Sequence, residues 1–353
     1  MILSRYIFRE LFIAFVFTFI VILFICMVGL TFKTSRLSAG AGLAMVGQSL
    51  PMALAMLAPW VVLIAISAST ILVYGRLSAE HEISAILMAG ISPIRIILPA
   101  LFFATLLSIG GYFLHEYAAP WAHLHQRIMV RQSIIHLLKA PPPGNQTFTI
   151  GPYMVGYTQY RDGEMKRLIV IDEQDRTQRL VYTAEAGRFD LSDPLVPKLI
   201  LLNGELRGEG QEKTGGMKGE GEIRIELDVS SLKNQSKGAK DMSSEELLEY
   251  AKTHPSEKKR RDAWTQYYTR HALALGPLFL ILLCAPIGIL IRKGSRLAGF
   301  GTAIPPFLLY LLSTLIGRAL GEGNHLPPMI AGWLPDIVTL LAAIPFLRKV
   351  FRT

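Results

Sequence analysis

The chain has few charged residues and almost no cysteine for its 353 residues. Charged residues make up 18% of it, whereas hydrophobic residues make up 51% and the mean hydropathy is +0.37. This balance is too apolar for an ordinary soluble protein, so the composition favours a membrane protein. The two cysteines, Cys26 and Cys284, both fall in long apolar stretches. Their position excludes a disulfide framework or a thiolate metal site outside the membrane.

Residues that common catalytic motifs require are also missing. GLAMVGQS at 42–49 has the spacing of a phosphate-binding loop but carries Gln48 where that loop needs a lysine. HEISA at 81–85 begins like a zinc-protease helix, yet Ala85 stands where the second metal-binding histidine would be. His123 and His125 would point about 200° apart on a helix, which favours a wetted helix extension over a metal site. The sequence therefore predicts no enzyme and no metal site.

What the sequence does have is six long apolar runs. A spanning helix needs roughly 20 mostly uncharged residues, because the hydrocarbon core is about 30 Å thick and an α-helix rises about 1.5 Å per residue. The runs are 11–30, 50–73, 96–114, 272–291, 297–317 and 326–347. They predict six spans in a three-plus-three arrangement, with a first span that is not cleaved as a signal peptide.

Lysine and arginine are unevenly distributed between the two ends of these spans. One end carries Arg5, Arg9, Arg76, Arg95, Arg292, Lys293, Arg296, Arg348, Lys349 and Arg352. The short loops at the other end carry only Lys33, Arg36 and Arg318. Positive residues near span ends are preferentially retained in the cytoplasm. Both termini and the stretch 74–93 are therefore predicted to be cytoplasmic, and the long segment between spans three and four to lie outside.

The exported segment, 132–262, has a charged, glycine-rich and strand-forming composition. In EIRIELDVS at 222–230 apolar and charged residues alternate, which is the period of a strand with one buried face. Further strands are predicted at 147–150, 153–157, 167–172, 179–184 and 198–202, followed by a flexible loop from Gly204 and a short helix with a capping box at Ser243 and Glu246. The predicted fold class is a polytopic α-helical membrane protein with an inserted, jelly-roll-like β domain, divided as 1–131, 132–262 and 263–353.

Asp336 is the one acidic residue inside a predicted span. Intramembrane carboxylates are often functional, but a proton relay needs a partner at similar depth, and the sequence identifies none. A packing role, with hydrogen bonds to backbone freed by Pro335, is the other interpretation. The sequence leaves both open.

The stretch YGRLSAEHEISAILMAGISP at 74–93 is unusually polar for its place between two spans. A helical projection collects Ala79, Ile83, Ile86, Leu87 and Gly90 on one face. The short helix predicted at about 78–90 is too acidic for a basic membrane-surface anchor. An exposed apolar stripe rimmed by acids suits a groove on a partner protein instead.

Together these features resemble one family, the lipopolysaccharide-export permeases of the LptF/LptG (YjgP/YjgQ) type. The likeness covers nearly the whole chain. It includes the basic and aromatic start SRYIFRE, three spans on each side of an exported β domain, and the pattern E-I-x-x-I-x-x-x-G-I-S at 82–92. Family members commonly have methionine where Ile86 stands. APW at 119–121 and GRL at 75–77 look closer to the LptF branch.

The resemblance implies a permease subunit, and not an enzyme, in the inner membrane of a Gram-negative type of bacterium. Such permeases form a heterodimer with a paralogue over a dimeric cytoplasmic ABC ATPase, so ATP is used by the partner and no cofactor is expected here. A single-span periplasmic partner of LptC type is also implied, and no nucleic acid. By that likeness the cytoplasmic helix is the coupling helix, and Glu82, Ile83, Ile86, Leu87 and Gly90 contact the ATPase.

The resemblance places lipopolysaccharide handling at the outer ends of the spans. Lys33, Arg36 and Arg318 lie where the family contacts this lipid, and their cationic groups suit the phosphates of lipid A. Snorkelling to ordinary headgroups is the simpler alternative. Two other function classes also stay open. A stand-alone lipid or secondary transporter predicts ionisable residues at mid-span, and a membrane-anchored scaffold with a periplasmic binding domain leaves the cytoplasmic helix without a role.

Overall fold

A computed structural model of the chain divides into two units. The structure describes residues 2–37, 43–139, 141, 146–150, 153–161, 163–172, 179–190, 198–209, 217–218, 222–226, 237–291 and 296–352. The first unit comprises 1–28, 51–124 and 237–353, and the second comprises 29–50 and 125–236.

Helices make up most of the described chain. They are α1 (Ile2–Leu37), α2 (Leu43–Ala79), α3 (Glu82–Met88), α4 (Pro93–Phe113), the π-helix η1 (Leu114–Ala118), α5 (Ala119–Lys139), α7 (Ser244–Thr253), α8 (Glu257–Leu290), α9 (Arg296–Glu322) and α10 (Pro328–Arg352). Within the described residues, six stretches are long and apolar enough to cross a membrane: Ile2–Gly29, Leu50–Ala79, Pro93–Met129, Glu257–Leu290, Gly301–Glu322 and Pro328–Arg352. The prediction of six membrane helices is therefore confirmed.

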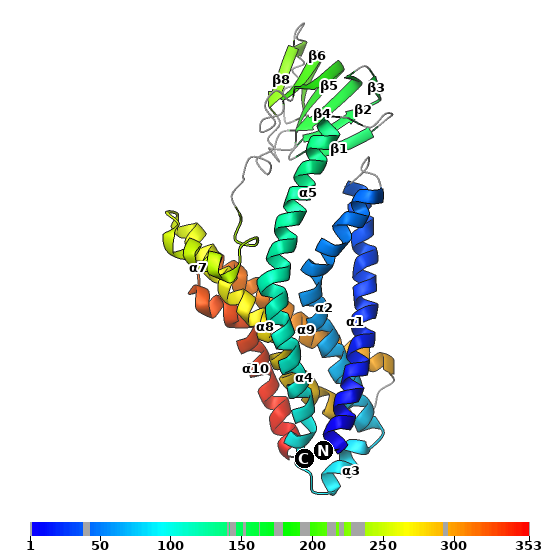
Figure 1. Ribbon diagram of the computed structural model, residues 1–353, viewed down its shortest axis with the longest axis vertical. Coiled ribbons are helices and arrows are strands. Elements are labelled where there is room, and N and C mark those ends of the chain that lie inside the picture. The colour runs from blue at the N-terminus through cyan, green and yellow to red at the C-terminus, as the bar shows by residue number, and fades with distance from the viewer. Residues whose placement is uncertain are drawn as a thin grey trace. The chain divides into compact units, whose positions relative to one another are not determined.

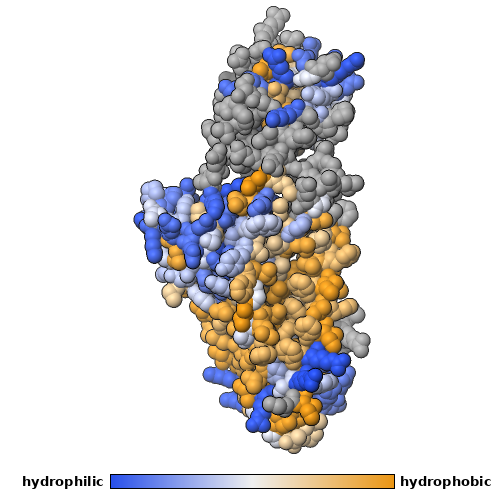
Figure 2. Space-filling model, in the orientation of Figure 1, coloured by the Kyte–Doolittle hydropathy of each residue, from blue (hydrophilic) through white to orange (hydrophobic). Residues whose placement is uncertain are grey.

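The core of the first unit forms around α8, which packs against α4, α9 and α10. Side chains of α1, α2, α4 and α8, among them Leu11, Leu63, Phe103 and Leu280, belong to one buried apolar cluster. α1 nevertheless exposes much apolar surface, and Phe17 and Phe24 are 66% and 68% exposed. Figure 2 shows hydrophobic residues spread over the helices on the face in view, with hydrophilic residues gathered near the lower end and at the upper left, where α7 lies. Such a surface suits contact with lipid or with another membrane subunit.

Close packing of α8, α9 and α10 depends on glycine. A Cβ atom added to Gly332 of α10 would overlap Tyr268 of α8 and lie 2.8 Å from the backbone nitrogen of Thr269. Gly317 of α9 faces the carbonyl of Ala331 in the same way, too close for a Cβ. Small residues let membrane helices approach until their backbones are in contact. These glycines therefore set the distance between the three helices.

α7 begins with the predicted capping box. The Ser243 hydroxyl accepts from the Glu246 N–H at 3.3 Å, and the Glu246 carboxylate accepts from the Ser243 N–H at 3.1 Å. Lys237 also donates to Glu246, at 2.5 Å, and this hydrogen bond lowers the pKa of the Glu246 carboxyl. α7 belongs to the first unit, although its residues fall within the segment 132–262 that is predicted to be exported.

Eight described strands of the second unit form one antiparallel sheet (Figure 1). They are β1 (Gln146–Ile150), β2 (Tyr153–Tyr157), β3 (Gln159–Arg161), β4 (Glu164–Asp172), β5 (Arg179–Asp190), β6 (Lys198–Glu209), β7 (Met217–Lys218) and β8 (Glu222–Glu226). Their order is β1-β2-β4-β5-β6-β7, while β3 pairs with β4 and β8 with β6.

One face of this sheet carries the core of the second unit. Tyr153, Val155 and Tyr157 alternate inward along β2, and Leu138 at the end of α5 packs against them. In β4 the buried residues Met165 and Leu168 are three positions apart. The positive φ of 51° at Arg167 shifts the alternation by one residue, so that both side chains reach the same core.

The sequence predicted the end of β6 wrongly. It placed a strand at 198–202 and a flexible loop from Gly204, whereas β6 continues to Glu209. The second half of β6 pairs with the first half of β5, where Leu206 lies opposite Tyr182. Backbone pairing therefore outweighs the loop-like composition. The first part of the strand predicted at 222–230 is described as β8, and 227–230 lie outside the described residues. The jelly-roll arrangement stays a prediction.

Candidate functional site

The chain turns sharply between α2 and α4, at the end of the first unit where α1 begins and α10 ends (Figure 1). α2 continues to Ala79, and His81 adopts a left-handed conformation with φ of 63° before α3 begins at Glu82. Gly90, with φ of 77°, donates its N–H to the carbonyl of Leu87 at 3.0 Å and closes α3. The single helix predicted at about 78–90 is thus the last residues of α2, a turn, and α3.

A buried side chain and a side-chain hydrogen bond attach α3 to the spans. Ile83 is 3% exposed and belongs to the core of the first unit. The hydroxyl of Tyr6 in α1 donates to the Glu82 carboxylate at 3.3 Å. Near this contact Arg76 of α2 forms an ion pair of 2.9 Å with Glu10 of α1. A displacement of α3 therefore acts directly on α1 and α2.

The structure corrects the prediction of an exposed apolar stripe. Ile83 faces the core, and Ile86 and Leu87 are half-buried against the same cluster. Of the predicted stripe only Ala79 and Gly90 are exposed, and the other exposed residues of this corner are Glu80, His81, Ala85, Met88 and Ala89. Met88 is 84% exposed, and sequence reasoning missed it because it lies off the stripe. Methionine is a flexible apolar side chain that suits protein contacts, and that chemistry is the signal that identifies it.

At the opposite end of the first unit, Arg318 of α9 is part of a polar contact with α8. One of its terminal nitrogens donates to the side-chain oxygen of Gln266. Its Nε is buried and has no hydrogen-bond partner among the described residues. The guanidinium thus keeps a donor for a further acceptor. Lys33 and Arg36 lie in the last turns of α1, and their side chains are outside the described residues.

Glu116 and Arg270 hold α7 onto the spans next to this position. Glu116, in η1, is 8% exposed and accepts from both the N–H and the hydroxyl of Ser244, the former at 2.8 Å. Arg270 of α8 is 5% exposed and donates to the carbonyl of Met242 at 2.8 Å. The two buried charges are in electrostatic range of each other. Glu116 lies on a π-helix, a distortion that is frequent at functional sites.

Asp336 has the partner that the sequence did not identify. Its carboxylate lies 3.1 Å from the hydroxyl of Tyr310 in α9, and that hydroxyl also lies 3.2 Å from the carbonyl of Ala272 in α8. The second carboxylate oxygen is buried without a partner in the described part of the chain. These contacts connect α8, α9 and α10. They support the packing role over the proton-relay role, with Tyr310 as the partner in place of freed backbone.

No group of three or more His, Cys, Asp or Glu side chains that could hold a metal ion occurs within the residues that the structure describes. His115 and Glu116 are consecutive in η1, and the Glu116 carboxylate accepts a hydrogen bond from the Ser244 N–H. His123 and His125 lie on α5.

Comparison with known proteins gives one match. A family model described as "Lipopolysaccharide export system permease LptF/LptG" matches residues 5–349. This match includes α3, Arg318 and both halves of the membrane region. No curated protein matches the chain significantly.

Proposed function

We infer that this chain, which belongs to the lipopolysaccharide export permease family LptF/LptG, is one of two related membrane subunits that carry lipopolysaccharide out of the inner membrane. The observation that carries the proposal is the family match over residues 5–349. The proposed assembly is a heterodimer with a paralogous permease over a dimeric cytoplasmic ATPase, and the APW and GRL segments favour the LptF branch over the LptG branch for this chain. Its three-plus-three spans enclose an exported domain at 132–262, and both termini are cytoplasmic.

α3 is the proposed coupling helix. ATP-driven movement of the ATPase would displace α3, and the buried Ile83 and the Tyr6–Glu82 hydrogen bond would pass the displacement to α1 and α2. Glu82, Ile86, Leu87 and Gly90 are the proposed contacts, together with Met88. Ile83 acts in this scheme as the anchor of α3 in the core. The movement of these helices would then compress the cavity between this chain and the paralogous permease.

Charge reversal at Glu82 tests this coupling. Glu82→Arg places a second cation beside Arg76 and removes the acceptor of Tyr6. We expect at least tenfold less ATPase to co-purify with the permease, because a like charge at an interface typically costs more than about 1.4 kcal/mol. Tyr6→Phe removes only the hydrogen bond and is expected to retain the ATPase.

Glu249→Arg is the matched control, because Glu249 is an exposed acid on α7, away from α3. It is expected to leave co-purification unchanged. Lipopolysaccharide transport that continues without any ATPase would contradict the proposal and favour a stand-alone lipid transporter.

Arg318 is the proposed site of contact with a lipid A phosphate, together with Lys33 and Arg36. The unpartnered Nε of Arg318 supports this role, because guanidinium groups bind phosphate through two donors. Arg318→Gln is expected to lower photo-crosslinking of lipopolysaccharide next to position 318 at least tenfold. Hydrogen bonds to charged groups contribute about 1.5–3 kcal/mol.

Lys259→Gln is the control, because it removes an exposed cation near the start of α8, the end of that helix that Arg318 contacts through Gln266. Equal crosslinking in both variants would show that Arg318 only snorkels to headgroups. Crosslinks to another glycolipid, without lipopolysaccharide, would change the substrate.

The sheet of the second unit is the proposed exit path. Acyl chains would pass along the apolar face that carries Val155, Leu168 and Val170, in a jelly-roll-like domain. Edge strands are natural sites for pairing with another sheet, so a periplasmic partner of LptC type is proposed to bind there. β1 pairs only with β2 among the described strands, which supports it as such an edge.

A further inference from the structure

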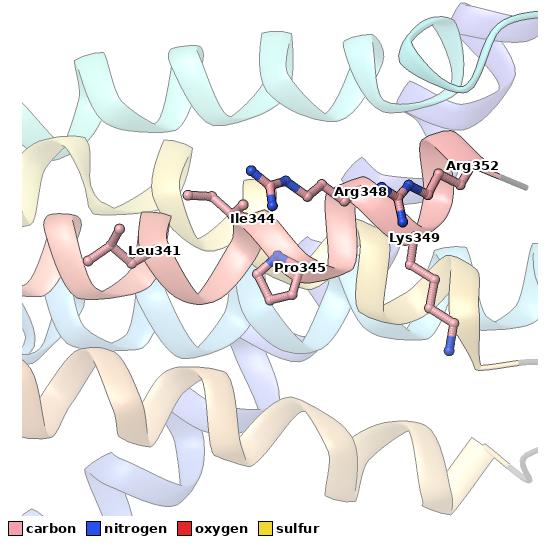
Figure 3. Close-up of a pocket in the computed structure, with 6 residues that line it drawn as sticks. All are labelled: Leu341, Ile344, Pro345, Arg348, Lys349 and Arg352. Atoms are coloured by element: carbon pink, nitrogen blue, oxygen red, sulfur yellow. The ribbon is translucent and has the colours of Figure 1, made fainter.

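A groove runs along the last turns of α10, at the end of the first unit where α3 lies. It has a volume of about 590 Å³ and is lined by Leu341, Ile344, Pro345, Arg348, Lys349 and Arg352. Figure 3 shows Leu341, Ile344 and Arg348 extending from the same side of α10, with Arg352 one turn further along and Lys349 directed away from them. The groove is thus apolar toward the middle of the span and cationic toward its end.

The two arginines of this groove are available for an anion. Both are exposed, and no hydrogen bond or ion pair joins either guanidinium to another side chain within the described residues. They are four positions apart, so they lie on one side of the helix. Guanidinium groups bind phosphate bidentately. The charge of the groove therefore complements a phosphate.

We propose that this groove binds an acidic phospholipid of the adjacent leaflet, with its phosphate on Arg348 and Arg352 and an acyl chain along Leu341 and Ile344. Leu341 lies seven residues before Arg348, which is about 10 Å deeper along the helix. A soluble protein or a free phosphate gains nothing from apolar residues at that depth, whereas an acyl chain does. Basic pockets at the ends of membrane helices are known sites for acidic headgroups. This lipid site is separate from the proposed export route.

Lipid retention tests the site on the full-length protein. We expect native mass spectrometry of the purified chain, supplied with equal amounts of phosphatidylglycerol and phosphatidylcholine, to show preferential binding of phosphatidylglycerol. Each basic residue near an acidic headgroup contributes about fivefold in binding. Arg348→Gln with Arg352→Gln is therefore expected to reduce that preference roughly thirtyfold.

Arg5→Gln with Arg9→Gln is the matched control, because these exposed arginines of α1 have the same four-residue spacing and do not line the groove. The control is expected to keep the preference. Leu341→Ser keeps both cations and is expected to weaken binding of both lipids. Arg348→Lys with Arg352→Lys keeps the charge, loses the bidentate geometry, and is expected to fall between the wild type and the glutamine variant. It serves as the readout if the glutamine variant does not fold.

Three results would overturn the proposal. A wild type without preference for phosphatidylglycerol would exclude an acidic-lipid site. Equal loss in the α1 and α10 variants would indicate general surface charge. If excess inorganic phosphate alone displaced the lipid, the arginines would be assigned to a free phosphate. If the α10 variant lost a bound acidic protein and not a lipid, they would be assigned to a protein partner.

Discussion

Replacing Gly332 by leucine is expected to lower the free energy of unfolding of the membrane region by roughly 3 kcal/mol or to prevent its folding. Even the first carbon of a side chain there would overlap Tyr268 and lie 2.8 Å from the backbone nitrogen of Thr269. The contact involves backbone, so rotation of a side chain cannot relieve it. α10 would have to move away from α8. That movement would also separate the hydrogen-bonded groups of Asp336 and Tyr310.

Thermal unfolding in detergent, followed by size-exclusion chromatography, measures this effect. Gly301→Leu is the matched control, because Gly301 is exposed on α9 and a Cβ there meets nothing within 4 Å. It is expected to unfold at the wild-type temperature. Gly332→Ala is expected to lie between the two. If Gly332→Leu were as stable as Gly301→Leu, the close approach of α8 and α10 would not exist in the protein.

Local patterns were enough to predict the membrane helices and most strands. A run of apolar residues long enough for the bilayer is visible in the sequence, as is the alternation along β2. The length of β6 could not be predicted, because Gly204–Glu209 are held in the sheet by pairing with β5, a partner that the local composition does not reveal. β3 and β7 are too short to produce a pattern.

The candidate site was predictable in position but not in orientation. The helix between spans two and three was expected, and α3 is there. Its apolar stripe has the same periodicity whether it faces a partner or the chain's own core, and packing directs Ile83 to the core. Polar contacts between distant segments left no signal in the sequence. Glu116 and Ser244, for example, are 128 residues apart and share a hydrogen bond only in the fold.

Replacing Glu116 by leucine is expected to cost roughly 3–5 kcal/mol and to release α7 from the spans. The substitution keeps the volume but leaves the Ser244 N–H and the buried Arg270 without their anionic partner. A buried charge without its counter-charge is strongly destabilising. Hydrogen exchange of residues 237–253, together with the unfolding temperature, measures both effects. Glu116→Gln keeps an acceptor for Ser244 and is expected to lose less.

A double variant separates loss of a charge partner from loss of packing. Arg270→Met in the Glu116→Leu background removes the stranded cation, so it is expected to recover part of the lost stability. Glu249→Leu, on the exposed side of α7, is the control and is expected to change stability by less than about 0.5 kcal/mol. If hydrogen exchange of α7 were the same in Glu116→Leu as in the control, Glu116 would not be what holds this helix. With Glu116 intact, α7 fixes the point at which the chain returns from the sheet to the spans. Its release would therefore be expected to reduce transport even where the ATPase still binds.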